Sequence, residues 1–277
     1  MGVSVVQDEL MMEGMNEKGL SAGLFYFPDY GKYEEYSEAN YETNISDFQL
    51  VSYILGRCAT VDEVKAEIAR VHIHGFDPRS STVHWRFAEP SGRQIVLEII
   101  DGKCIFYENN LGVLTNSPSF DWQLTNLNNY VNLLPGRTEP HTLGNMSLSS
   151  FGGGSAMIGL PGDFTPPSRF VRAAFFQNTA PQKPDAEGSV FTAFHILGSM
   201  EIPIGAQFPV DETPADIPSA TQCTCVTDMS GLKFYYRSMY DGGIRCIDLK
   251  EIDFKKIGLK SEPLVPSKKE FVHHIRF

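Results

Sequence analysis

Residues 14–28 read GMNEKGLSAGLFYFP, and this stretch decides the fold. Its first part contains glycine and asparagine, which favour a turn over residues 13–20. Val3–Val6 and, more weakly, Leu10–Met12 have the apolar character of strands on one side of that turn, and Leu24–Phe27 has it on the other. The pattern predicts a hairpin. The first residues of the sequence therefore resemble the middle of a fold rather than its first element.

After the predicted hairpin, the spacing of apolar residues is first that of helices and then that of strands. Ser46 can cap a helix that runs to residue 55, and Thr60 with Glu63 forms the capping box of a second helix. From Thr82 onward, short β-rich runs follow one another, and PSG and DG separate the first three. This arrangement predicts an antiparallel meander with the runs TVHWRFAE, QIVLEII, KCIFYE and GVLTN.

The second half of the chain again groups its helices and strands separately. Helices are predicted for FDWQLTNLNNYV, for SRFVRAAFFQ with Thr165 as its cap and Pro166 in its first turn, and for residues 186–200. Strands return in CTCVTD, KFYYRS and IRCIDL. This segregated order favours a single α+β domain over residues 1–277 rather than alternating βαβ units.

Composition limits the functional classes. Hydrophobic residues make up 42% of the 277 residues, which indicates a globular chain long enough to bury a core. The formal net charge of −11 repels phosphate backbones and argues against a nucleic-acid partner. No apolar run is long enough to span a membrane. The five cysteines are sparse and odd in number, so a disulfide framework is not expected.

Three local patterns resemble functional sites without meeting their requirements. GGGSAMIG lacks the Lys-Ser/Thr ending of a phosphate loop, and Met157 replaces the last glycine of G-x-S-x-G. His72 and His74 share a strand face, but no third ligand has metal-site spacing. Cys223 and Cys225 also share a strand face, where buried thiols are usually small apolar residues. No metal and no cofactor are predicted.

Three separated stretches carry a more specific signal. The first is the turn Asn16–Leu20, NEKGL. The second is Thr115–Pro118, TNSP, followed by Asn126-Leu127. The third is Gly159–Asp163, GLPGD, followed by Ser168-Arg169-Phe170. In their order and detail they resemble the choloylglycine hydrolase family, which comprises bile salt hydrolases and penicillin V acylases of the N-terminal-nucleophile (Ntn) hydrolase superfamily. The resemblance covers essentially the whole chain.

This resemblance implies a fold and two site residues. The fold is an αββα sandwich of four layers, in which two antiparallel sheets lie between helices. Asn116 matches the family asparagine whose amide donates to the oxyanion of the tetrahedral intermediate. Arg169 matches an active-site arginine that keeps the nucleophilic thiol ionised. Alternatively, Asn116 is a turn residue and Arg169 is a surface charge on its helix, as Arg172 is expected to be.

The resemblance also suggests where the acyl group of the substrate lies. Bile salt hydrolases have an asparagine where Phe25 falls, whereas penicillin V acylases have an aromatic residue there. Phe25 and its neighbour Tyr26 therefore favour aromatic acyl substrates, although both rings could equally be core residues. Candidate substrates are penicillin V-like acyl amides, conjugated bile salts and other N-acyl amides.

The family nucleophile, an N-terminal cysteine, has no counterpart here, because no cysteine precedes Cys58. We therefore expect the first strands of the family fold to be missing, sheet edges to be exposed, and these 277 residues to be inactive. Three explanations are open: the start is wrongly assigned, the gene is a remnant, or another chain supplies the strands. Two alternatives remain: a non-catalytic family member that binds an apolar ligand or a partner, and an unrelated α+β module.

The resemblance finally implies self-association. Family members commonly form tetramers through a loop between the asparagine and arginine motifs. Residues 132–155, rich in glycine and serine, occupy that place in this sequence. We therefore expect a homo-oligomer.

Overall fold

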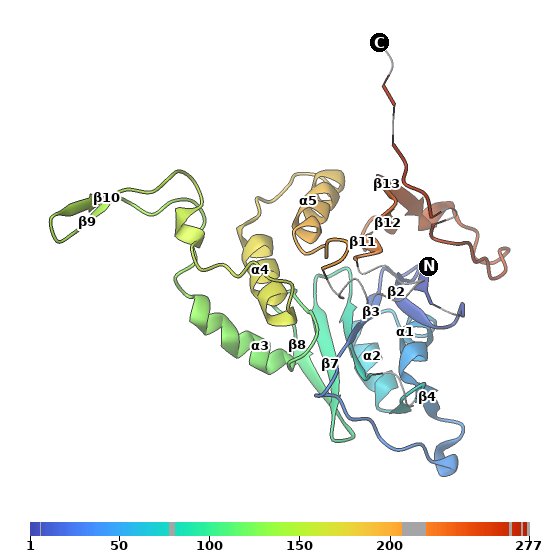
Figure 1. Ribbon diagram of the computed structural model, residues 1–277. Coiled ribbons are helices and arrows are strands. Elements are labelled where there is room, and N and C mark those ends of the chain that lie inside the picture. Colours follow the sequence, from blue (N-terminus) through green and yellow to red (C-terminus); the bar gives the residue numbers. More distant parts are fainter. Residues whose placement is uncertain (6, 78–80, 207–219, 266–267, 273, 276–277) are drawn as a thin grey trace.

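A computed structural model describes residues 1–5, 7–77, 81–206, 220–265, 268–272 and 274–275. Its largest sheet is antiparallel and has six strands in the order β1-β2-β3-β6-β7-β8. A second antiparallel sheet has the order β11-β12-β13 (Figure 1). The strands are β1 (Gly2–Ser4), β2 (Met11–Met15), β3 (Ser21–Tyr26), β6 (Val83–Ala88), β7 (Gln94–Ile100), β8 (Lys103–Glu108), β11 (Cys223–Asp228), β12 (Lys233–Ser238) and β13 (Asp241–Asp248).

The outer face of the six-stranded sheet packs against two helices, α1 (Leu50–Leu55) and α2 (Val61–Ile68). Side chains alternate between the faces of a strand. The large residues Trp85, Phe87 and Leu97 consequently share one face, where they form a fully buried core with α1 and α2. This packing joins the helical layer of α1 and α2 to the six-stranded sheet.

The inner face of the same sheet has two neighbours. At β7, Val96 packs against Phe120 of α3 (Phe120–Asn126) and Phe170 of α4 (Pro166–Thr179). At β2, Met15 packs against Phe234 of β12, so the two sheets lie face to face there. The two contacts place α3, α4 and the second sheet on the same side of the large sheet.

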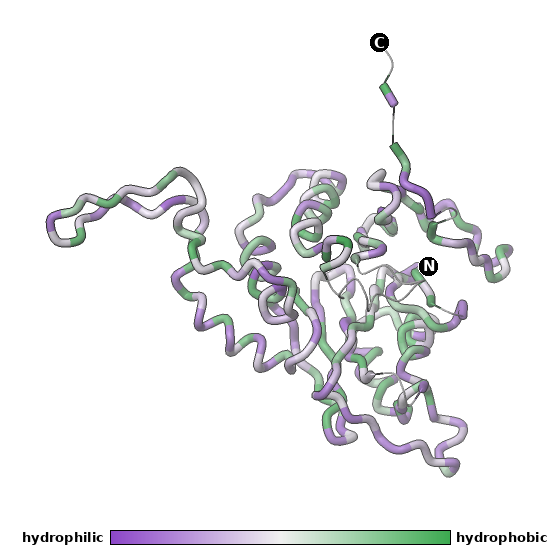
Figure 2. Tube along the Cα trace, viewed as in Figure 1, coloured by the Kyte–Doolittle hydropathy of each residue, from purple (hydrophilic) through white to green (hydrophobic). Residues whose placement is uncertain are grey.

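Helix α5 (Ala186–Gly198) closes the structure. On β12, Phe234 faces the large sheet, and the next residue, Tyr235, points the other way and packs against Val190 and Phe194 of α5. The layers therefore follow the order helix, sheet, sheet, helix that the resemblance implies. Hydrophobic and polar segments alternate along the chain, and hydrophobic segments lie at the edges of the molecule as well as in its centre (Figure 2).

Most local signals of the sequence are found in the structure. The β2–β3 hairpin encloses the NEKGL turn, and Thr60 caps α2 by accepting a hydrogen bond from the Glu63 amide. Ser46 caps a short 3-10 helix (Asp47–Gln49) that leads into α1. The meander is present as β6–β8. In the strand predicted for Val3–Val6, Val6 lies outside the described residues.

Two features differ from the sequence prediction. GVLTN is not a strand, because its backbone groups bond to side chains instead of a neighbouring strand: Asn109 donates to the Val113 carbonyl and accepts from the Gly112 amide. A small parallel pair, β4 (Asn44–Ser46) with β5 (His72–His74), was not expected. Among the described residues, no helix has the length and apolarity needed to cross a bilayer.

Candidate active site

The NEKGL turn joins the large sheet to α1 through one side chain. Asn16 Nδ2 donates at 2.9 Å to the carbonyl oxygen of Leu55, the last residue of α1, and at 2.7 Å to that of Cys58, just beyond the helix. Its Oδ1 accepts from the backbone amides of Lys18 and Leu20, at 3.0 and 3.1 Å. Both ends of the amide are therefore used to fix the turn, and Asn16 has a structural role.

Asn116 lies in the loop between β8 and α3 and is bound to the end of β3. Its Nδ2 donates to the carbonyl oxygen of Tyr26 at 2.9 Å, and the neighbouring Ser117 hydroxyl donates to the carbonyl of Pro28 at 2.6 Å. Within the described residues, this is the one acceptor found for Nδ2. Because a primary amide carries two hydrogens on its nitrogen, the second remains free to donate to a ligand.

Arg169 meets Asn116 from α4. Its guanidinium donates to Asn116 Oδ1 at 2.7 Å and, through Nε, to the Phe164 carbonyl at 2.9 Å. The first contact fixes which end of the Asn116 amide is oxygen, so its nitrogen faces Tyr26. Burial, followed by repulsion from Arg172, lowers the pKa of Arg169. A guanidinium remains charged after such a shift, so the site holds a fixed positive charge.

Arg172 is not the exposed helix charge that the sequence suggested. Its side chain is buried and donates to the backbone carbonyls of Pro161 at 2.9 Å and Asp163 at 2.5 Å. The Asp163 carboxylate accepts from Thr165 and from Ser168, and these hydrogen bonds lower its pKa to about 2. The GLPGD segment is thus folded back onto the first turns of α4, where it positions Arg169.

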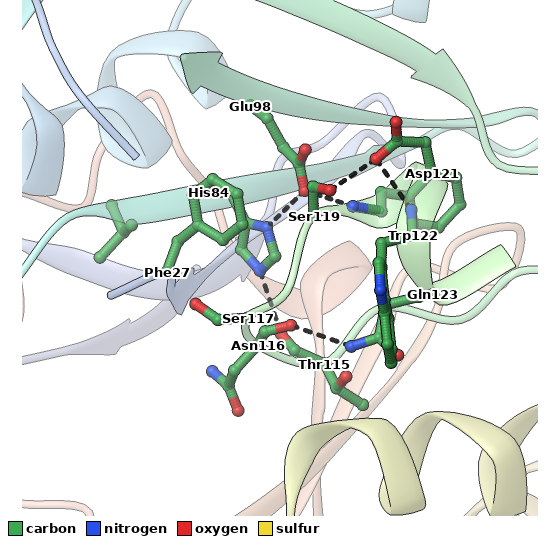
Figure 3. A network of polar contacts seen from close by, with 12 residues as sticks. Phe27, His84, Glu98, Thr115, Asn116, Ser117, Ser119, Asp121, Trp122 and Gln123 are labelled. Atoms are coloured by element: carbon green, nitrogen blue, oxygen red, sulfur yellow. Dashed lines mark hydrogen bonds and ion pairs between the residues drawn. The ribbon is translucent and has the colours of Figure 1, made fainter. Parts of the chain in front are cut away.

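A buried pair of ionisable residues, His84 and Glu98, holds the loop that carries Asn116 (Figure 3). His84 on β6 and Glu98 on β7 have no exposed side-chain surface, and His84 Nδ1 lies 3.1 Å from Glu98 Oε1. His84 Nε2 lies 3.1 Å from the Thr115 carbonyl oxygen, which can only accept, so Nε2 carries a hydrogen. Glu98 Oε1 also accepts from the Phe120 amide at 2.9 Å.

These contacts place one shared proton between the two side chains. A single proton lies between His84 Nδ1 and Glu98 Oε1, and the two residues are either an imidazolium with a carboxylate or a neutral pair. The His84 ring also stacks on Phe27, with centroids 4.5 Å apart. The network thereby fixes both the carbonyl before Asn116 and the start of α3. Neither His84 nor Glu98 was among the site residues predicted from the sequence.

A cavity of about 670 Å³ opens between the two sheets. Of the two aromatic residues predicted to contact the acyl group, one lines this cavity and the other does not. Phe25 lines the cavity, together with Leu114 and Ala173. Tyr26 follows Phe25 on β3 and therefore points to the opposite face, where 54% of its surface is exposed. Only its carbonyl oxygen takes part in the site, through Asn116.

None of the cysteines occupies the position of a nucleophile beside Asn116 and Arg169. Cys58 lies in the core beneath α1 and α2, and burial raises the pKa of its thiol to about 11, the opposite of activation. His72 Nδ1 bonds to Glu34 at 2.8 Å rather than forming a metal site with His74. In the described part of the chain, no group of three or more His, Cys, Asp or Glu residues could hold a metal ion.

Comparison with known proteins agrees with this architecture. A bile salt hydrolase/transferase from Clostridium perfringens is 34% identical over 258 residues, which span 91% of this chain and 77% of that protein. Penicillin V acylase from Pectobacterium atrosepticum is 30% identical over 268 residues, spanning 89% of this chain and 64% of the acylase.

The fold matches as well. The crystal structure of a variant of conjugated bile acid hydrolase from Clostridium perfringens superimposes with a TM-score of 0.85 at 31% identity, over 99% of this chain and 84% of that one. This match confirms the α+β fold of the Ntn hydrolases that the sequence predicted. The family model described as linear amide C–N hydrolases, choloylglycine hydrolase family, matches residues 1–262. The chain therefore belongs to the choloylglycine hydrolase family of linear amide C–N hydrolases.

Proposed function

We propose that Asn116 and Arg169 are the binding and activating groups of an amide hydrolase. The observation that carries the proposal is the 2.7 Å contact between Arg169 and Asn116 Oδ1, which leaves one hydrogen of Nδ2 available. A neutral amide donor suits the oxyanion that develops on the carbonyl oxygen of the substrate, because it donates without titrating. The guanidinium supplies the positive charge that keeps a nearby thiolate ionised.

The acyl group of the substrate would occupy the cavity beside Phe25. The walls there combine the Phe25 ring with apolar side chains from α4 and α5, such as Ala173 and Ile196. This lining favours an acyl amide with an aromatic or otherwise apolar group. Penicillin V-like amides, conjugated bile salts and other N-acyl amides have that character, and the names of the relatives include both of the first two classes.

The reaction also requires a nucleophile, which we propose to be the N-terminal cysteine of an active form. The 277 residues contain no cysteine before Cys58, and Cys58 is buried with a raised pKa. Asn116 and Arg169 can position and polarise an amide, but neither can attack it at neutral pH. We therefore propose that these 277 residues alone do not turn over an amide.

The test compares two forms of the protein. The 277-residue chain and a form extended at its N-terminus by a segment that begins with cysteine would each be assayed against penicillin V and a glycine-conjugated bile salt. We expect hydrolysis by the extended form alone. Turnover by the 277-residue chain would refute its inactivity. An extended, folded form that hydrolyses neither of these substrates nor a panel of N-acyl amides would refute the proposed activity.

A second candidate function is non-catalytic binding of an apolar ligand. It is favoured by one observation: the cavity is already open although, among the described residues, no cysteine bonds to Asn116 or Arg169. Isothermal titration calorimetry of the 277-residue chain with phenoxyacetate or cholate tests this candidate function. Binding by a chain whose extended form stays inactive would favour this candidate over the enzyme.

We also propose that the protein forms a homo-oligomer through the arm at residues 132–155. This arm carries the hairpin of β9 (His141–Leu143) and β10 (Met146–Leu148), which projects away from the layers (Figure 1). Leu143 and Met146 are 69% and 64% exposed. A lone two-stranded hairpin is marginally stable in water, so a partner surface would stabilise it.

A further inference from the structure

Two cysteines form a close pair away from Asn116 and Arg169. Cys223 and Cys225 lie on β11, two residues apart, so their side chains share one face of the strand. Their sulfur atoms are 3.3 Å apart, and both residues are half-buried free thiols. Both line the cavity between the sheets, so small molecules that enter the cavity can reach them.

The residue between them holds this face in place. Thr224 points to the other side of β11 and donates from its hydroxyl to Glu201 at 2.5 Å, and Glu201 also accepts from Arg237 at 2.7 Å. Because side chains alternate along a strand, anchoring Thr224 toward α5 keeps both sulfur atoms on the cavity side. The pair is therefore a fixed feature of the cavity wall.

The contact makes the two thiols chemically different. The hydrogen bond from Cys225 lowers the pKa of Cys223, although burial acts in the opposite direction. The same hydrogen bond, together with burial, raises the pKa of Cys225. Cys225 also packs against the cluster of Met15, Phe234 and Leu249, whereas Cys223 lies outside that cluster, so Cys223 is the thiol better placed to ionise and Cys225 the one to donate to it. A thiolate beside a second thiol is the arrangement found at redox-active cysteine sites.

We propose that Cys223 and Cys225 are a redox-active dithiol that exchanges with low-molecular-weight disulfides. The Cys223 thiolate attacks one sulfur of a disulfide RSSR, forms a mixed disulfide and releases RS⁻. Cys225 then gives up its proton and attacks Sγ of Cys223, which closes the Cys223–Cys225 disulfide and releases the second RS⁻. The protein loses two electrons and two protons, and RSSR becomes two RSH.

Strand geometry indicates that the closed form is easily reduced. Two residues apart on an extended strand, the Cα atoms lie about 6.6 Å from each other. Disulfides span about 4.4–6.8 Å between Cα atoms, so the bridge is near its upper limit and strained. Strained disulfides have more oxidising potentials and are the labile ones. The site would thus follow the redox state of its surroundings reversibly.

The remaining cysteines provide internal controls. Cys104 and Cys246 are exposed, and Cys58 is buried in the core. Among the described residues, Cys223 and Cys225 are the one pair of thiols in contact. Cys104 and Cys246 can form mixed disulfides with a small thiol, but each lacks a neighbouring thiol to resolve them.

The experiment incubates reduced 277-residue protein with oxidised glutathione, quenches with acid, alkylates the free thiols and maps the peptides by mass spectrometry. We expect an intramolecular Cys223–Cys225 disulfide that dithiothreitol reverses, while Cys104 and Cys246 carry glutathione. Stable glutathione on Cys223 in the otherwise unchanged protein, or no reaction of either thiol while Cys104 reacts, would overturn the proposal.

Two variants test the order of attack. Cys225→Ser should trap glutathione on Cys223, because the resolving thiol is gone. Cys223→Ser should react at Cys225 about tenfold more slowly, because Cys225 packs against the cluster of Met15, Phe234 and Leu249 and burial raises the pKa of its thiol. Equal rates would contradict the assigned roles. A Cys246→Ser control should leave the disulfide unchanged. All readouts are masses, so they do not depend on whether the protein hydrolyses amides.

Discussion

The Nε2 atom of His84 lies 3.1 Å from the carbonyl oxygen of Thr115, the residue that precedes Asn116. The other nitrogen of the ring pairs with Glu98 at 3.1 Å, in a region without solvent exposure. One strand pair therefore holds the loop that carries the proposed oxyanion donor. The position of Asn116 depends on two ionisable residues that do not contact the proposed ligand position themselves.

Glu98→Gln tests this dependence. The change replaces the carboxyl group that bonds to His84 by an amide and leaves the buried imidazole without its acid partner, and we expect the free energy of unfolding to fall by about 3 kcal/mol in urea denaturation. Glu108→Gln is the matched control, because Glu108 pairs with Lys65 and Arg93 at the surface, where ion pairs contribute little. Equal effects of the two changes would show that the buried pair is not a structural support.

Asp47→Asn should change how stability depends on pH. Asp47 is almost completely buried, and burial raises its pKa above the usual 3.8, although the amides of Phe48 and Phe76, the Tyr33 hydroxyl and the charge of His74 act in the opposite direction. The folded state therefore binds the proton more tightly than the unfolded state. Stability contributed by the protonated form is lost as pH rises from 3.8 through the folded pKa.

The asparagine side chain cannot ionise, so the variant does not lose this stability as pH rises. We expect its melting temperature relative to the unchanged protein to be higher at about pH 7 than at about pH 4. Differential scanning fluorimetry across this range measures the difference. Asp101→Asn, at an exposed turn, should show no such trend. A constant offset for Asp47→Asn would mean that its burial does not affect its ionisation.

Arg172→Met should loosen the GLPGD segment. The change leaves the carbonyls of Pro161 and Asp163 without the guanidinium that now bonds to both. Hydrogen bonds from a charged donor contribute more than neutral ones, so we expect the free energy of unfolding to fall by about 1–3 kcal/mol and proteolysis near residue 162 to accelerate. Arg137→Met, at an exposed position on the arm, is the control. Unchanged proteolysis would argue against Arg172 as the residue that fixes this segment.

The sequence predicted those parts of the fold that depend on neighbours along the chain. The β6–β8 meander follows from alternating residues and two turn signals, and α2 follows from the Thr60 cap. GVLTN was misread because β propensity does not report that Asn109 side-chain atoms take its hydrogen bonds. The burial of Arg172 was likewise hidden, because it depends on a preceding loop folding back onto α4.

The site was predictable only where a motif matched. Asn116 and Arg169 came from the family resemblance, and the structure brings them into contact across 53 residues. His84 and Glu98 left a weaker signal that could have been used. Each is an ionisable residue inside an apolar strand of the meander, and buried charges usually require a partner on the adjacent strand. Phe25 and Tyr26 could be separated by strand alternation alone.

Asn116→Asp tests the proposed oxyanion donor in a form of the protein that hydrolyses an amide. The carboxylate keeps the contact with Arg169 but cannot donate to an oxyanion, so kcat should fall by about 10²–10³-fold with a small change in KM. Asn128→Asp, on the exposed 3-10 turn that follows α3, should leave kcat unchanged. A rise in KM with kcat unchanged would instead assign Asn116 to substrate binding.

The arm at residues 132–155 leads to a prediction about assembly. Leu143 and Met146 expose apolar side chains on a hairpin that is separated from the core, and a partner surface would remove both from water. We expect the protein to sediment as an oligomer at micromolar concentration, and the double change Leu143→Ser with Met146→Ser to shift it to monomer without a change in circular dichroism. Ile257→Ser, at another exposed apolar position, should not affect assembly. A protein that sediments as a monomer before any substitution would refute the proposed role of the arm, and an oligomer that survives the double change would place the interface elsewhere.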